Sequence, residues 1–444
     1  MNASPAPDSL AARLSDRLFR SLSGDLPPIG TSRNLRTGVP PPNKATPVVG
    51  VRRGGKTTYL HQLRHARLRQ GVARECLPYL AFDDERLTGL NERNLRVLVD
   101  EYYGRYPALR HQTTVTWCFD EIEVVPGWER FIRYLMEHER VEVFIAGSSV
   151  SLMPRSSDAA PGSTGEIRVY PFSFAEYLRF HGQPLPQSIT AMREPSLEKH
   201  FREFLQRGGF PAVQRLNAAE REVLLADIID LALLRDVLEK NALTSSISVL
   251  RALLAQLMGS AATVLGSDKL TFGLRTHGHG HSRESVEHLL ENLEAAFLVR
   301  TVPIESGSPL QRYQARKVYP VDTALIPLYE RSSGRSPAAA VETAVLLELE
   351  RRGLNVTYVN PGPGLEVDFL ARRAGGEQEL IQVCWTSEDF GSAERALQGL
   401  REAERLYPHA TRRLLTLSRT EIPAKLPVGM FAQPAYEWLL STGE

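Results

Sequence analysis

Hydrophobic and polar positions follow two different periods along this chain, and the change between them divides it into segments. From Thr46 onward, short apolar runs are separated by stretches with helical spacing, which is typical of a parallel sheet with crossover helices. Residues 8–22 precede these runs and predict a short amphipathic helix, followed by a Pro-rich loop. The predicted strands lie within TPVVGV, LPYLAF, TTVTWCF, VEVFIAG and EIRVYPFS.

The middle third has a different pattern, because it reads as almost wholly helical from about Phe174 to Glu294. A strand pair follows, around AAFLVRTVPI and KVYPVD. The stretch RSSGRSPAAA predicts a linker before a last α/β block. That block reads helix, three strands, helix, strand, and the fold class of the whole chain is therefore α/β.

Composition narrows the class of protein. A chain of 444 residues suits two to four domains, and 42% hydrophobic with 24% charged residues is ordinary for globular proteins. A formal net charge of +1 argues against a general nucleic-acid binder. No run reaches the roughly 18 apolar residues of a membrane span, and the N-terminus lacks a signal-peptide apolar region. Three scattered cysteines predict neither disulfides nor a metal site, so we expect a reduced, cytoplasmic protein. Because no apolar run is long enough to span a membrane, we expect no membrane partner.

The stretch GVRRGGKTTYL carries the clearest chemistry, since it fits the pattern G-x-x-x-x-G-K-[ST] between a buried strand and a helix. Glycines let the backbone wrap phosphates, and helix N-terminal N–H groups point at them. A lysine adds a compact positive charge, and the following hydroxyl can bind Mg²⁺. The predicted ATP-binding residues are Gly50, Arg53, Gly54, Gly55, Lys56, Thr57 and Thr58.

A second strand, TTVTWCF, ends in an acidic pair. Asp120 can hold Mg²⁺ together with Thr57, and Glu121 can deprotonate the attacking water. A third strand ends in Ser148 and Ser149, and Ser148 is placed to sense the γ-phosphate. The sequence thus predicts ATP and Mg²⁺ as cofactors and Lys56, Glu121 and Ser148 as catalytic residues.

Seven motifs in fixed order resemble one known family. They are GVRRGGKTTYL, CFDEIEVVPGWE, FIAGSSVSLM, YPFSFAEYL, RGGFPAV, KVYPVDTAL and EVDFL…LIQVCW. Together they are similar to the widespread prokaryotic AAA+ "ATP-binding protein" family with a C-terminal nuclease-like domain, over roughly residues 30–420. The resemblance implies a P-loop NTPase parallel sheet, a helical lid, a winged helix and a restriction-endonuclease-like α/β domain.

These expectations translate into domain boundaries along the chain. We expect an N-terminal extension at 1–40, an AAA+ P-loop ATPase core at 41–173, a helical lid at 174–240, a winged-helix domain at 241–325 and a nuclease-like domain at 326–444.

One position departs from the family pattern. The family places Gly-Arg about eight residues before its Pro-[Leu/Phe]-Ser-Phe motif, whereas this chain has Gly162-Ser163 before Pro171. A trans-acting arginine at a neighbour's γ-phosphate accelerates hydrolysis by orders of magnitude. Arg155 and Arg168 are candidate substitutes, but neither is in register. Slow intrinsic turnover, or a nucleotide switch instead of a motor, is the expectation.

The segment from Lys269 to Ile304 reads helix, turn, helix, β-hairpin, the order of a winged helix. Ser282 caps the second helix, whose exposed face offers Arg283 beside Glu284. One acid next to one base is a poor DNA-reading face, so DNA binding and interdomain packing both stay open. In HGHGH, histidines at 277, 279 and 281 alternate with glycines. No cysteine or acidic cluster lies nearby in the sequence, which favours a solvated glycine-rich turn over a metal site.

The last block resembles the PD-(D/E)-x-K nuclease fold. By position in that resemblance, Glu342, Asp368 and Gln382 occupy the metal-holding places, and Cys384 occupies the place of the lysine. The chain has no lysine between Lys317 and Lys425, so no lysine is expected at this site. A thiol cannot replace an ammonium, and the sequence therefore predicts a vestigial nuclease site.

These observations predict an ATP-binding AAA+-like ATPase whose nucleotide state drives or gates domain rearrangement. An inactive nuclease-like domain would then serve partner binding. A nucleotide-gated DNA-binding protein with little turnover and an ATP-gated nuclease are the alternatives. Beyond ATP, the candidate partners are DNA through the winged helix, a protein, or further copies of the chain.

Overall fold

The computed structural model describes residues 10–34, 45–147, 165–188, 195–239, 246–276, 278–306, 308, 315–329, 337–385 and 390–441, with only the backbone at 390–392. The chain forms two compact units. The first comprises residues 1–50 and 55–169, and the second comprises residues 51–54 and 170–444. Four loop residues therefore group with the second unit although both of their chain neighbours belong to the first.

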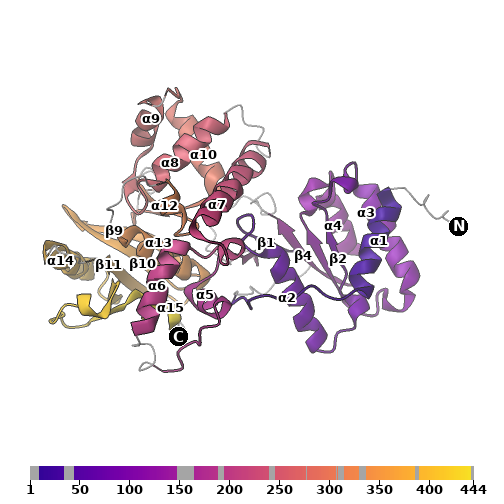
Figure 1. Ribbon diagram of the computed structural model, residues 1–444, viewed down its shortest axis with the longest axis horizontal. Coiled ribbons are helices and arrows are strands. Elements are labelled where there is room, and N and C mark those ends of the chain that lie inside the picture. Colours follow the sequence, from indigo (N-terminus) through magenta and orange to yellow (C-terminus); the bar gives the residue numbers. More distant parts are fainter. Residues whose placement is uncertain are drawn as a thin grey trace. The chain divides into compact units, whose positions relative to one another are not determined.

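The first unit is built on a five-stranded sheet of order β2-β3-β4-β1-β5, in which every neighbouring pair is parallel (Figure 1). All five predicted strands are confirmed. Because the strands are parallel, the carboxyl ends of β1, β3 and β4 meet at one edge. The strands are β1 (Thr46–Val49), β2 (Tyr79–Ala81), β3 (Val115–Asp120), β4 (Val141–Gly147) and β5 (Ile167–Arg168).

The helices of this unit bury regularly spaced apolar side chains. The first helix confirms the amphipathic prediction, since Leu14, Leu18 and Leu22 are four residues apart and buried. Its Arg17 donates to the carbonyl of Ala81 over 3.1 Å, which fastens the helix at the end of β2. The helices are α1 (Leu10–Ser23), α2 (Lys56–Arg69), α3 (Glu92–Arg105) and α4 (Trp128–His138).

The second unit begins with helices and a small three-stranded sheet of order β6-β8-β7. The predicted strand pair is present as β7 and β8, but the third strand, Val264–Leu265, lies in the stretch that was expected to be helical. The helix α7 runs directly into a π-helical stretch, Leu233–Glu239. The elements are α5 (Phe174–Phe180), α6 (Pro195–Arg207), α7 (Ala218–Ala232), α8 (Ile247–Met258), β6 (Val264–Leu265), α9 (Ser267–Thr276), α10 (Arg283–Ala295), β7 (Val299–Pro303), β8 (Arg316–Pro320) and α12 (Leu325–Tyr329).

The last block has the predicted order of helix, three strands, helix and strand, with one further strand and helix at its end. Its sheet has the order β13-β12-β11-β10-β9. The linker prediction partly fails, because Ala338–Ala340 already belong to α13, while residues 330–336 lie outside the described part. The elements are α13 (Ala338–Arg351), β9 (Asn355–Gly362), β10 (Leu365–Arg372), β11 (Gln378–Cys384), α14 (Phe390–Leu406), β12 (Thr411–Thr416), β13 (Met430–Pro434) and α15 (Ala435–Leu440).

The helices α14 and α13 cover opposite faces of this last sheet (Figure 1), and each face carries its own hydrophobic core. One core packs Leu400 of α14 against Val367 and Leu380. The other packs Val345 of α13 against Phe369 and also takes in apolar residues of α5, α6, β7 and β8. A shared core of this kind makes the helical, three-stranded and C-terminal segments one cooperative unit.

Three of the sequence motifs converge inside the second unit. The buried carboxylate of Asp322 accepts hydrogen bonds from the backbone N–H groups of Gly209 (2.7 Å) and Ala324 (2.9 Å). Gly209 in turn accepts from the N–H of Phe172 over 2.7 Å. A Cβ at Gly208, which has a φ of 74°, would overlap the Asp322 carboxylate. The YPFSF, RGGFP and VDTAL motifs therefore form one structural junction.

Candidate functional site

The glycine-rich loop between β1 and α2 adopts a backbone that its glycines require. Gly50 has a φ of 151° and Gly55 a φ of 105°, the left-handed range that L side chains rarely adopt. A Cβ on Gly50 would overlap the carbonyl of Val169. Arg53 also has a positive φ, 56°, and is exposed, whereas Gly54 is buried and donates its N–H to Val51 over 3.1 Å. The loop therefore reaches the N-terminus of α2 through positive φ values at Gly50, Arg53 and Gly55.

Lys56 is the first residue of α2 and is buried, with 6% of its surface exposed. Its Nζ donates to the carbonyl of Gly50 over 2.9 Å, so the ammonium contacts the first residue of the glycine-rich loop. Thr58 follows within α2 and is partly buried. This places a fixed positive charge where the sequence predicts the phosphates.

Loop residues 51–54 belong to the second unit. There the guanidinium of Arg52 makes two hydrogen bonds to the carboxylate of Asp236, at 2.7 and 3.0 Å. Asp236 lies in the π-helical stretch after α7 and is buried. Sequence reasoning missed this pair, because 184 residues separate its members.

The structure brings together Thr57 and Asp120, as the sequence predicts. Thr57 Oγ1 donates to Asp120 Oδ2 over 2.6 Å, and the Tyr79 hydroxyl donates to the same oxygen over 3.0 Å. Asp120 ends β3 and is 4% exposed. Burial raises its pKa, although the hydrogen bond from Thr57 opposes the shift.

The other oxygen of Asp120 identifies a binding position. Oδ1 is buried and has no hydrogen-bond partner among the described residues. A buried acceptor of this kind costs free energy unless something satisfies it. Oxygen ligands suit Mg²⁺, so the hydroxyl of Thr57 and the carboxylate of Asp120 fit the metal that the nucleotide requires.

Glu121 is held in a strained conformation at the end of β3. Its φ is 57°, an uncommon value for a residue with a Cβ, and its N–H donates to Ala146 in β4 over 2.8 Å. The side chain is partly exposed. The backbone therefore fixes the position from which the Glu121 side chain extends, at the same sheet edge as Asp120.

A third carboxylate at this edge was missed by sequence reasoning. Glu123 packs so closely on Gly147, the last residue of β4, that any Cβ at Gly147 would overlap its carboxylate. The signal for it was the third acid of DEIE, which reads as an ordinary surface turn. Ser148 and Ser149 follow Gly147 but lie outside the described residues, as do Gly162, Ser163 and Arg155.

Arg168, one candidate substitute for the missing arginine, lies in β5 beside Val49 of β1. Its Nε donates to Glu166 over 2.5 Å, and only 19% of the side chain is exposed. This arginine is therefore engaged within its own chain.

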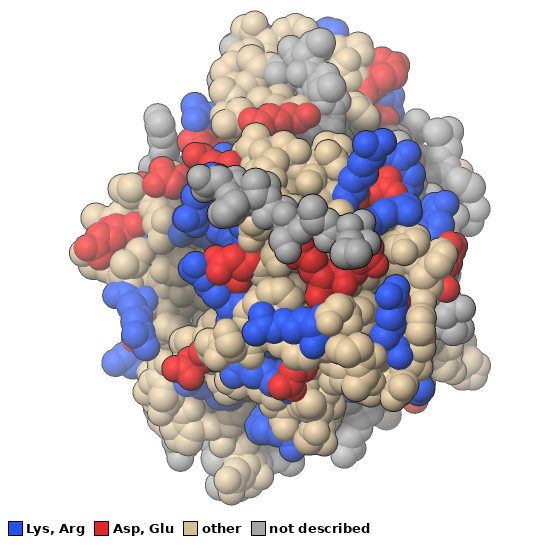
Figure 2. All heavy atoms as spheres, turned by 90° about the vertical axis from the view of Figure 1, so that its right-hand side faces the viewer, with Lys and Arg blue, Asp and Glu red and all other residues tan. Residues whose placement is uncertain are grey.

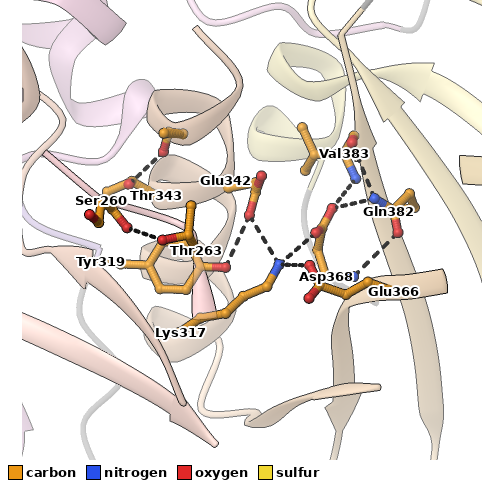
Figure 3. Close-up of polar contacts among 11 residues, drawn as sticks. Ser260, Thr263, Lys317, Tyr319, Glu342, Thr343, Glu366, Asp368, Gln382 and Val383 are labelled. Carbon is orange, nitrogen blue, oxygen red and sulfur yellow. Dashed lines mark hydrogen bonds and ion pairs between the residues drawn. The ribbon is translucent and has the colours of Figure 1, made fainter. Parts of the chain in front are cut away.

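The C-terminal candidates also come together, but around a residue that the sequence reasoning had excluded. Glu342 lies on α13, Asp368 on β10 and Gln382 on β11. The expectation that no lysine reaches this site was wrong. Lys317 of β8 lies among the carboxylates, with Nζ 2.8 Å from Asp368 Oδ1 (Figure 3).

Lys317 has two more carboxylate neighbours, Glu366 at 2.5 Å and Glu342 at 3.6 Å. The Tyr319 hydroxyl donates to Glu342 over 3.0 Å. Gln382 Nε2 donates to Asp368 Oδ2 over 2.7 Å (Figure 3). The place assigned to a lysine, Cys384, holds a buried free thiol in the core under α14.

The histidine-rich turn gains no support as a metal site. His277 lies outside the described residues, while His279 and His281 are at or near the surface between α9 and α10. Within the described ranges, no three His, Cys, Asp or Glu side chains are grouped so as to hold a metal ion. The helices of the described part likewise include none long and apolar enough to cross a membrane.

Comparison with protein families matches two parts of the chain. Residues 42–178 match the family described as AAA domain, and residues 198–333 match the family described as Domain of unknown function (DUF8612). The first match covers the sheet of the first unit and all the loop and acidic residues above. The second runs from α6 to α12 and includes Lys317.

Similar proteins extend over most of the chain. The "Uncharacterized protein MJ1544" of Methanocaldococcus jannaschii is 28% identical over 370 residues, 82% of this chain and 79% of that protein. An "Uncharacterized protein" of Haemophilus influenzae is 27% identical over 343 residues, 76% of this chain and 80% of that protein.

Two solved structures were also matched. The Walker-type ATPase PABY2304 of Pyrococcus abyssi aligns with a TM-score of 0.34 and 13% identity, over 71% of this chain and 94% of that one. Cdc6p from Pyrobaculum aerophilum aligns with a TM-score of 0.23 and 12% identity, over 74% and 95%. The match of residues 42–178 to the AAA domain, together with the loop and Asp120 geometry, supports a P-loop AAA-like ATPase domain in this chain.

Proposed function

We propose that this protein is a Mg²⁺-dependent ATPase whose nucleotide state drives or gates a change in the arrangement of its domains. The observation that supports it most is the contact between Thr57 and Asp120 beside the loop whose Gly50 carbonyl accepts from Lys56. A hydroxyl, a carboxylate and an ammonium thus lie at one sheet edge.

Each residue has a separate task in the proposed reaction. The backbone N–H groups of the loop and the ammonium of Lys56 bind the phosphates. To do so, Lys56 exchanges its hydrogen bond to the Gly50 carbonyl for phosphate oxygens. Charge neutralisation at the β- and γ-phosphate oxygens would come from Mg²⁺ held by Thr57 and Asp120.

Glu121 is the proposed general base. A carboxylate next to the Mg²⁺ ligand can orient a water molecule toward the γ-phosphate and accept its proton. Tethering of its N–H to Ala146 limits where that carboxylate can lie. Ser148 is the proposed sensor, and Gly147 before it packs on Glu123.

Turnover is proposed to be slow in a single chain. Ser163 stands where the resemblance places an arginine, and Arg168 is engaged with Glu166. Without a positive charge delivered to the γ-phosphate, hydrolysis loses a contribution of about 10³–10⁵ in rate.

Gating is proposed from the course of the chain through the loop. The backbone passes from the first unit at Gly50 into the second at residues 51–54 and returns at Gly55. Because the phosphates would bind this loop, a change of nucleotide would act on residues 51–54, which belong to the second unit. Within that unit, Arg52 contacts Asp236.

The winged-helix and nuclease-like segments are proposed to act in packing and partner binding. Arg283 at the start of α10 pairs with Glu287 at 3.2 Å and approaches Asp268 at 3.7 Å, which leaves a poor DNA-reading face. Figure 2 shows acidic and basic side chains of the described residues interspersed on the face of the first unit that it draws.

The small sheet also continues into the last block. Glu305, just after β7, donates its N–H to Tyr358 over 2.7 Å and accepts from Arg372 over 2.7 Å. These contacts use the hairpin for packing within the second unit. A nucleotide-gated DNA-binding protein therefore ranks behind the ATPase.

The proposal is tested by steady-state ATP turnover of the purified chain with and without DNA, together with limited proteolysis in ATP, ADP and neither. We expect slow, Mg²⁺-dependent turnover that DNA leaves unchanged, and a cleavage pattern that differs between ATP and ADP. DNA binding without turnover would favour the DNA-binding alternative. DNA cleavage that requires ATP and Asp368 would favour the nuclease.

A further inference from the structure

Lys317 is one of only two buried lysines among the five that the structure describes, the other being Lys56 of the phosphate loop. The exposed three are Lys199, Lys269 and Lys425. With 1% of its side chain exposed, Lys317 cannot solvate its charge. A buried ammonium needs matched anionic partners, and the chain supplies them from distant segments.

The ammonium has three donors, and it faces three carboxylates (Figure 3). Asp368 lies at 2.8 Å, Glu366 at 2.5 Å and Glu342 at 3.6 Å from Nζ. Two of these acids come from β10 and one from α13, while the lysine comes from β8. Three oxygen-bearing groups around one positive centre is the arrangement that proteins use for divalent cations.

Two acids of β10 face this centre together. Glu366 and Asp368 are two residues apart, the spacing that places side chains on the same face of a strand. Register shifts against β9 lie between Leu365 and Val367 and between Val367 and Leu370. Both acids contact the same ammonium.

The electrostatics agree with this geometry. Burial alone lowers the pKa of an ammonium, but the charge of Asp368, with further contributions from Tyr319, Glu342 and Glu366, raises that of Lys317 well above its usual value. Lys317 is therefore charged throughout the physiological range. Burial, and then the charge of Asp368, raises the pKa of Glu342 to about 8.

A divalent metal does not fit this site as it stands. The ammonium takes the central position, and Asp368 Oδ2 is used by Gln382 Nε2 (2.7 Å) and the N–H of Val383 (2.8 Å). Nor do the described residues group three potential ligands around a vacant centre. We infer that the Lys317 ammonium occupies the position that a divalent cation would take between Asp368, Glu366 and Glu342. Replacing Lys317 by an uncharged residue would then allow these three carboxylates to bind a metal ion.

A buried tyrosine lies beside the ammonium. Tyr358 is fully buried, and its OH has no hydrogen-bond partner among the described residues. Lys317 Nζ lies over the face of its ring, 5.8 Å from the ring centroid. Glu366 is 38% exposed, so solvent reaches one of the three carboxylates.

The experiment measures Mn²⁺ binding to the nucleotide-free full chain by the electron paramagnetic resonance signal of free Mn²⁺. Lys317→Met keeps the length of the side chain but removes its charge. We expect this variant to bind one Mn²⁺ per chain more than wild type. The double variant Lys317→Met/Asp368→Asn, which differs by one carboxylate oxygen, should lose that additional ion.

Thermal unfolding provides a second readout. Lys317→Met should melt lower than wild type in chelator and recover with added Mn²⁺, because a cation again screens the carboxylates. If Lys317→Met cannot be purified, Lys317→Met/Glu342→Gln removes one negative charge as well and should show the same recovery. Any change in the melting temperature of wild type with added Mn²⁺ should be the same in Asp368→Asn, because wild type has no metal at this position.

Three results would overturn the inference. One is a folded Lys317→Met protein with neither additional Mn²⁺ nor a Mn²⁺-dependent melting temperature. Another is Mn²⁺ bound by wild type and lost in Asp368→Asn. The third is labelling of Lys317 in wild type by an amine-reactive reagent as fast as that of the exposed Lys269. A buried ammonium paired with carboxylates must react with the reagent more slowly than an exposed one.

Discussion

The hydroxyl of Thr57 donates a hydrogen bond of 2.6 Å to Asp120 Oδ2, although 63 residues separate them in the chain. Parallel strands make this possible, since β1 and β3 end at the same edge of one sheet. Asp120 is left with one oxygen satisfied and one buried without a partner among the described residues. A positively charged ligand would satisfy this second oxygen.

Asp120→Asn should weaken the dependence of ATP binding on Mg²⁺. The amide keeps the shape of the side chain but can no longer offer Oδ1 as an anionic ligand. We expect about a 10- to 100-fold loss of Mg²⁺ affinity in the presence of ATP. The measurement is ATP affinity by calorimetry in Mg²⁺ and in EDTA, with the exposed Asp227→Asn as control. An unchanged ratio of the two affinities would remove Asp120 from the metal site.

Lys56→Ala should weaken ATP binding itself. Loss of one hydrogen bond to a charged group costs about 1.5–3 kcal/mol, which corresponds to roughly 10- to 100-fold in affinity. Titration with a fluorescent ATP analogue measures it, and the exposed Lys199→Ala is the matched control. A folded Lys56→Ala protein that binds ATP like wild type would contradict the loop assignment.

Gly208→Ala should destabilise the second unit far more than Gly182→Ala. Both glycines have left-handed φ values, 74° and 68°, but a Cβ at Gly208 overlaps Asp322, whereas nothing lies within 4 Å of one at Gly182. The conformational cost is about 1 kcal/mol at each position. Overpacking should add about 1–3 kcal/mol at Gly208 alone. Urea denaturation gives both values, and equal losses would show that the junction tolerates a methyl group.

The junction also predicts a pH dependence. Burial raises the pKa of Asp322 to about 6, although the N–H groups of Ala324 and Gly209 oppose the shift. The folded protein therefore binds a proton more tightly than the unfolded chain, and this contribution to stability is lost as the pH rises from about 4 to 6. The expected loss is about 2–3 kcal/mol, at 1.36 kcal/mol per pKa unit.

Asp322→Asn isolates that contribution, because an amide does not titrate. The free energy of unfolding of wild type minus that of the variant should fall between pH 4 and pH 6.5. Urea denaturation at four pH values in this range measures the difference. A constant difference would show that folding does not raise the pKa of Asp322, and a difference that rises with pH would show that folding lowers it.

Local sequence patterns predicted that Thr57 and Asp120 come together beside the glycine-rich loop, since the determinants of these positions lie within short segments. Gly50, Gly55 and Lys56 are six residues apart at most, and each strand with its following acid is one continuous run. The five strands and the helix before them were predicted for the same reason. Their register in the sheet was not predictable from the sequence, because it depends on contacts between distant segments.

The position of Lys317 beside Asp368 was not predicted from local sequence patterns. Its partner Asp368 is 51 residues away and separated from it by two helices and a strand, so distance in sequence wrongly argued that no lysine reached the site. A signal was nevertheless present. The chain has seven lysines among 53 basic residues, and Lys317 directly precedes the apolar run VYPV. A rare cation in a buried strand requires a buried anion.

The most direct test of the central claim is the ATP turnover of Glu121→Gln under single-turnover conditions, with ATP affinity measured on the same preparation. An amide in place of the carboxylate keeps the size of the side chain but cannot accept a proton from water. The proposed mechanism predicts a rate about 10²–10⁴-fold below wild type with ATP and Mg²⁺ binding retained, while the exposed Glu137→Gln turns over like wild type. Turnover by Glu121→Gln at the wild-type rate would contradict it.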